Sequence, residues 1–83
     1  MQKLSVKGLA LALGILWGFG ALFSGIAATY GWGVEFVNMM GSFYIGFEPS
    51  IKGAFIGFAW AFGDGLVGGA VLAWLYNVLS GPK

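Results

Sequence analysis

The chain has 83 residues, of which 59% are hydrophobic and only 8% carry a charged side chain. A soluble domain has about a quarter of its residues charged, so this composition predicts a membrane protein whose surroundings are the lipid bilayer. The net charge of +1 offers no basic surface for nucleic acid, and the absence of cysteine and histidine excludes disulfides and the usual metal sites.

The first apolar segment, residues 8–30, contains no charged residue. As a helix rising about 1.5 Å per residue, it is long enough to cross a hydrocarbon core of about 30 Å. A signal peptide is the alternative, because Lys3 and Lys7 precede the segment and Ala27-Ala28 resembles a cleavage site. The apolar core of a signal peptide usually has about 7–15 residues, and this segment is longer. We therefore predict a membrane span.

The connection, residues 31–52, has only three charged residues and is too apolar for an ordinary solvated loop. One interpretation is a short helix from Val34 to Phe43 lying in the outer interface, with one face formed by Val34, Val37, Met40 and Gly41. The other is an ordered loop that packs its aromatic residues on the spans. Pro49 disfavours helix before it, and Ser50 is a natural N-cap for the next helix.

The second apolar segment, residues 53–77, is interrupted only by Asp64. A break at residues 63–65 would give a re-entrant hairpin whose exposed backbone needs protein or water as a partner. One continuous helix is the simpler solution, and we predict it. The chain then forms a single all-α domain, an antiparallel hairpin of two transmembrane helices.

The lysines predict the orientation of this hairpin. Lys3, Lys7 and Lys83 lie near the two ends of the chain, whereas the connection holds Lys52 together with Glu35 and Glu48. The positive-inside rule then places both termini in the cytoplasm and the connection outside. We expect a multi-pass protein of a cell inner membrane.

Small residues recur at helical spacing in both segments. Such residues let two helices approach closely in lipid, and we expect these to pack helices together, within the hairpin or between copies. In the second segment they lie four apart, and in the first they alternate steps of four and three: Gly53, Gly57, Ala61, Gly65, Gly69 and Ala73, and Gly14, Gly18, Ala21, Gly25 and Ala28.

Asp64 is the charged residue that needs an explanation. If the ends of the two spans are level, Asp64 lies at the bilayer midplane opposite Gly20 and Ala21, where an ionised carboxylate costs about 2.5–3.5 kcal/mol. The nearest polar groups on the first span are Ser24 and the Trp17 indole, each about one turn away along the helix. Asp64 either lines a polar path with these residues or locks the helices by a buried hydrogen bond.

Two stretches resemble a known family. Residues 9–20, LALALGILWGFG, and 55–79, with Asp64-Gly65 and the ending AWLYN, resemble small bacterial two-span proteins that are classed as bacteriophage holins. That resemblance implies oligomeric pores in the inner membrane that release an endolysin. The chain is also similar to the c subunit of rotary ATP synthases in length and in its mid-helix carboxylate, but it lacks that family's Arg-Gln-Pro connection.

These observations lead to three functional hypotheses. The first is a holin-like pore or membrane-permeabilising homo-oligomer, in which Asp64 polarises the lumen. The second is an accessory subunit of a larger membrane complex, and the third is a proton or cation channel that uses Asp64. No nucleophile, base and orienting group are placed to converge, so we expect no enzyme, no catalytic residue, no cofactor and no metal.

Overall fold

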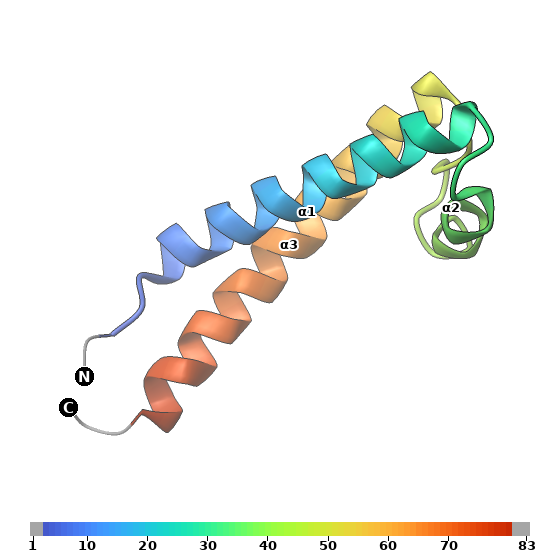
Figure 1. The fold of residues 1–83 in the computed structure, drawn as a ribbon. Helices are drawn as coiled ribbons and strands as arrows, with labels where there is room; N and C mark the ends of the chain where they lie inside the picture. The colour runs from blue at the N-terminus through green and yellow to red at the C-terminus, as the bar shows by residue number, and fades with distance from the viewer. Residues whose placement is uncertain (1–2, 81–83) are drawn as a thin grey trace.

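The computed structural model describes residues 3–80 of the chain, and they form three helices (Figure 1). Helix α1 spans Val6–Thr29, α2 spans Val34–Met40 and α3 spans Ile51–Leu79. With 24 and 29 residues, α1 and α3 are long and apolar enough to cross a membrane. The predicted all-helical chain with two long apolar helices is therefore confirmed.

Both long helices begin at a serine that caps their first turn. The Ser5 hydroxyl accepts a hydrogen bond from the Gly8 amide at 3.0 Å, and the Ser50 hydroxyl accepts one from the Gly53 amide at 2.8 Å. These contacts satisfy amide groups that have no partner inside the helix. Helix α3 continues without a break through residues 63–65. The predicted N-cap at Ser50 and the continuous second helix are both confirmed.

Helices α1 and α3 run antiparallel and pack along their small residues (Figure 1). A Cβ atom added to Gly65 would lie 2.7 Å from the Gly14 Cα, and one added to Gly69 would lie 2.7 Å from the Ala10 Cα. At the other end, a Cβ on Gly25 would lie 2.6 Å from the Ala54 Cα. The two backbones therefore touch, which only glycine permits at these three positions.

This packing gives a different register from the one predicted by levelling the ends of the spans. Gly65 lies against Leu13 and Gly14, so Asp64 is level with that part of α1 and not with Gly20 and Ala21. The expected register was wrong because close contact between small residues sets the relative position of the helices, not the alignment of their ends. Asp64 nevertheless lies within one residue of the middle of α3.

The connection folds back onto the helix pair, and α2 lies beside the end of α1 rather than beyond it (Figure 1). Val37 of α2 is fully buried, and Val34 and Met40 pack against the same cluster. The predicted short helix is present, but it ends at Met40, and the following residues form an ordered segment that also packs on the helices. The two interpretations of the connection therefore each describe part of it.

Phe47 is the residue that wedges this segment into place. A Cβ on Gly57 would overlap the Phe47 ring, and one on Gly25 would lie 3.2 Å from the same ring. Phe47 is only 4% exposed. Two glycines from different helices therefore form a notch that the ring fills. In the row of small residues on α3, Gly53 and Gly57 near the N-terminus pack on the connection. Gly65 and Gly69, nearer the C-terminus, pack on α1.

Candidate functional site

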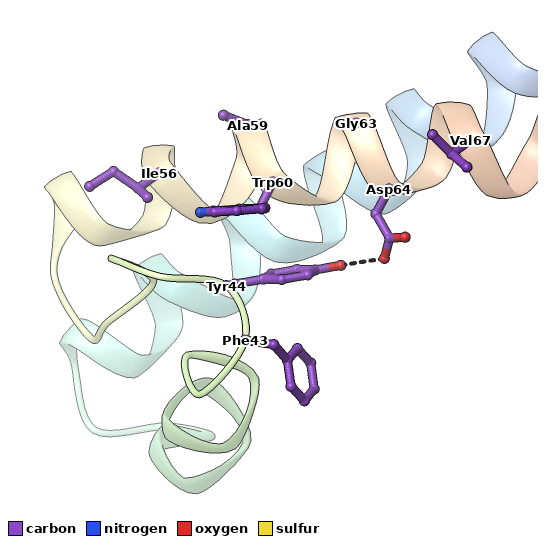
Figure 2. A pocket seen from close by; sticks show the side chains of 8 residues that line it. All are labelled: Phe43, Tyr44, Ile56, Ala59, Trp60, Gly63, Asp64 and Val67. Atoms are coloured by element: carbon purple, nitrogen blue, oxygen red, sulfur yellow. Dashed lines mark hydrogen bonds between the residues drawn. The ribbon is translucent and has the colours of Figure 1, made fainter.

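A chain of hydrogen bonds links the two long helices through the connection. The Trp17 indole Nε1–H on α1 donates to the Tyr44 phenol oxygen at 3.3 Å, and the Tyr44 O–H donates to Asp64 Oδ2 on α3 at 2.6 Å. Figure 2 shows the Tyr44 ring directed along α3 with its hydroxyl at the Asp64 carboxyl. The connection thus delivers a polar group to the middle of the second long helix.

Aromatic neighbours hold Tyr44 in this position. Its ring stacks on Trp60 with centroids 6.0 Å apart and planes 9° from parallel. It meets Phe43 edge-on at 5.9 Å and Phe47 at a tilt of 48° and 6.2 Å. The Trp60 indole N–H in turn donates to the Ile45 carbonyl at 2.8 Å. Tyr44 is therefore only 6% exposed. Packing and hydrogen bonds together fix the direction of its hydroxyl.

The surroundings of Tyr44 keep its phenol protonated. Burial raises the pKa of Tyr44 above its usual 10.0, and the hydrogen bond to Asp64 raises this pKa further because the neutral phenol is the donor. The Trp17 indole acts in the opposite direction, since it donates to the phenol oxygen. At neutral pH Tyr44 is accordingly a fixed hydrogen-bond donor to Asp64.

A groove runs beside this hydrogen-bond chain on the face of α3 that α1 does not cover. Its volume is about 860 Å³, and its lining is apolar apart from Tyr44 and Asp64. Phe43 and Trp60 are aromatic residues of its lining, and Ala59 and Gly63 of α3 also line it (Figure 2). Asp64 is exposed to this groove. The site therefore presents a carboxylate in apolar and aromatic surroundings.

The three polar residues predicted to meet are brought together only in part. Asp64 and Trp17 are joined, but through Tyr44 and not directly. Ser24 lies elsewhere and donates to the Gly20 carbonyl of its own helix at 2.8 Å. The predicted small residues are all buried, and each belongs to the interior of this one chain: Gly14, Gly18, Ala21, Gly25, Gly53, Gly57, Ala61, Gly65, Gly69 and Ala73.

No protein-family model, curated protein sequence or solved structure matches this chain. The geometry of the site therefore carries the functional argument.

Sequence reasoning missed Tyr44 and Trp60 as members of the site. The available signal was the connection itself, which is too apolar to be solvated and places Tyr44 in a run of hydrophobic residues. An amphipathic phenol there needs a partner for its hydroxyl once the ring is buried. No spacing rule, however, relates Tyr44 to Asp64, because the fold of the connection decides where that hydroxyl ends.

The groove presents two polar side chains, Asp64 and Tyr44, among apolar and aromatic residues. Among residues 3–80, no group of three or more Asp, Glu, His or Cys gathers to hold a metal ion. Asp64 accepts its hydrogen bond from a phenol that stays protonated, so this pair does not form a base with an activated nucleophile. The site therefore offers a carboxyl group, hydrogen-bonded to a phenol, beside aromatic rings.

Proposed function

We propose that this protein crosses a bacterial inner membrane as a hairpin and forms a holin-like homo-oligomer that makes the membrane permeable. Both termini would lie in the cytoplasm, as the lysines predict. The lengths of α1 and α3, about 36 and 43 Å as helices, support this arrangement. So do the large apolar side chains that both helices leave exposed, such as Leu16, Phe23 and Val67.

The observation that carries the proposal is the exposed carboxylate of Asp64 in the middle of α3. A carboxylate facing lipid at that depth costs about 2.5–3.5 kcal/mol, and the chain's own residues leave this face open. In an oligomer the grooves of several copies would face a shared aqueous space, which hydrates Asp64. The polar lining of the pore would then be Asp64 and the hydroxyl of Tyr44.

The copies would associate through surfaces other than the two small-residue seams. Those seams are buried between α1, α3 and the connection of one chain, so they are not available to a neighbour. Small residues that remain open outside the groove include Gly20 and Gly68, since a Cβ added to either of them meets no atom within 4 Å. Helices of neighbouring copies would approach most closely at these glycines.

The test is induced expression in bacteria with a dye that reports membrane potential. Wild-type protein should collapse the potential, and Asp64→Asn should slow or abolish the collapse, because it removes the charge that holds water in the lumen. Glu35→Gln on α2 is the matched control, since it removes an exposed carboxylate outside the groove. Equal collapse by wild type and Asp64→Asn contradicts the role given to Asp64.

Stoichiometry separates this proposal from the other two hypotheses. Purification in a mild detergent should give a homo-oligomer. A monomer, or a one-to-one complex with a different membrane protein, would refute the pore and favour the accessory subunit. Conductance in liposomes by a small oligomer, with a pH dependence that Asp64→Asn removes, would instead favour the proton or cation channel.

A further inference from the structure

The groove beside α3 has the lining of a ligand site. It is an open groove of about 860 Å³ rather than an enclosed cavity. Ligand sites are mostly apolar and contain a few fixed polar groups, and here these groups are Asp64 and the hydroxyl of Tyr44. The residues that form the groove come from α3 and from the connection.

The aromatic side of the groove is preorganised. Trp60 is held by its hydrogen bond to the Ile45 carbonyl and by stacking on Tyr44. It is still 44% exposed, and Phe43 is 59% exposed. Tyr44 is covered by its neighbours and offers mainly its hydroxyl. Both side chains therefore keep exposed surface in the groove that Asp64 also lines.

Within residues 3–80, the groove holds no positively charged side chain to pair with Asp64. Asp64 accepts a single hydrogen bond among the described residues, and its second carboxylate oxygen points away from Tyr44 (Figure 2). The nearest lysine along α3 is Lys52, twelve residues earlier and about 18 Å away along the helix axis. The lining residues of the groove include no cation. A ligand with a positive charge would complement it.

We propose that this groove binds a hydrophobic organic cation with a single positive charge, seated against Asp64, Trp60 and Phe43. Aromatic faces attract cations, and the apolar lining favours hydrophobic substituents around the charge. A lipid headgroup fits less well, because its phosphate would lie beside Asp64 without a cation to pair with. The proposal goes beyond permeabilisation, since one protomer supplies every group of the site.

The test is calorimetric titration of the purified full-length protein in a neutral detergent, with empty micelles subtracted. Tetraphenylphosphonium is the probe, triphenylphosphine oxide is its neutral analogue, and phosphocholine represents a zwitterionic headgroup. We expect saturable binding of the phosphonium alone. Asp64→Asn should weaken that binding about tenfold or more, as expected for loss of a charged partner, and Glu35→Gln should leave it unchanged.

A second pair of variants tests the aromatic contact without altering the carboxylate. Trp60→Leu should weaken phosphonium binding about three- to tenfold, whereas Trp60→Phe should retain most of it, because cation–π attraction needs a ring. Trp74→Leu is the control, since Trp74 is exposed near the end of α3 and lies outside the groove. These variants remain informative if Asp64→Asn does not fold.

Two results would overturn the proposal: equal binding of the phosphonium and its neutral analogue, or equal phosphonium binding by wild type and by both Asp64→Asn and Trp60→Leu. Tight binding of phosphocholine would instead assign the groove to a lipid headgroup. The experiments can refute the cation-binding inference and the proposed pore independently of each other. A protein that collapses the membrane potential without binding the phosphonium refutes only this inference, and one that binds it as a non-permeabilising monomer refutes only the proposed pore.

Discussion

Replacing Gly65 by alanine tests whether backbone contact holds the two long helices together. The new Cβ would lie 2.5 Å from the Leu13 carbonyl oxygen and 2.7 Å from the Gly14 Cα. Both are backbone atoms of a helix, so neither can rotate away as a side chain could. The two helices must therefore move apart to accept a single methyl group.

The size of this movement follows from the contact distances. Ordinary van der Waals contact begins at 3.4 Å, so α1 and α3 must separate by about 0.9 Å, a gap that forfeits about a quarter to a half of the dispersion attraction between facing atoms. Overpacking of this kind costs about 1–3 kcal/mol. The better helix propensity of alanine returns up to about 1 kcal/mol. We expect a net destabilisation of about 1–2 kcal/mol.

The chain contains no cysteine, so Lys7→Cys and Val78→Cys allow a donor and an acceptor dye to be placed at the end of the helix pair opposite the connection. Energy transfer during titration with a denaturing detergent then measures separation of α1 from α3. Gly68→Ala is the matched control, because a Cβ at Gly68 meets nothing within 4 Å. It should leave the midpoint unchanged or raise it. Equal midpoints for Gly65→Ala and Gly68→Ala would refute the reasoning.

Three further predictions concern the connection and the opposite end of the helix pair. Because the pKa of Tyr44 is raised on folding, the protein should show a tyrosinate absorbance step above pH 10 that Tyr44→Phe removes. Near this pH the folded state binds more protons than the unfolded state. The stability of the fold should therefore fall as the pH rises above 10. Phe47→Ala should destabilise the fold by about 3–5 kcal/mol by emptying the notch, whereas Phe55→Ala, at an exposed position, should have a small effect in the same detergent titration. Asn77→Ala removes two hydrogen bonds to the Leu4 backbone, of 2.8 and 3.0 Å, and should destabilise the helix pair by about 1–2 kcal/mol, which lowers the detergent midpoint. Asn38→Ala on α2 is the control.

Much of the fold follows from local patterns in the sequence. Two uncharged or nearly uncharged segments predict two long helices, and Ser50 after Pro49 predicts where the second begins. The regular spacing of small residues also marks the residues that become buried. These properties depend on neighbours within a few turns of one helix, so composition and periodicity are sufficient to reveal them.

The candidate site was only partly predictable, and the reason is geometric. Asp64 stands out in the sequence because a carboxylate is costly in apolar surroundings, and Trp17 was a reasonable partner for it. Tyr44 could not be assigned to them, because its place depends on where α2 ends and on how Phe47 inserts between Gly25 and Gly57. That insertion involves three segments far apart in the chain.

By itself, the sequence determined that this protein has two long apolar helices, that small residues line them and that a single carboxylate interrupts the second. Only the tertiary structure decided the register of those helices, the burial of both small-residue seams within one chain and the Trp17–Tyr44–Asp64 contact. Helix formation depends on hydrogen bonds and side chains a few residues apart, which a sequence displays directly. Register and the path of the connection depend on contacts between surfaces, which exist only after the helices have packed.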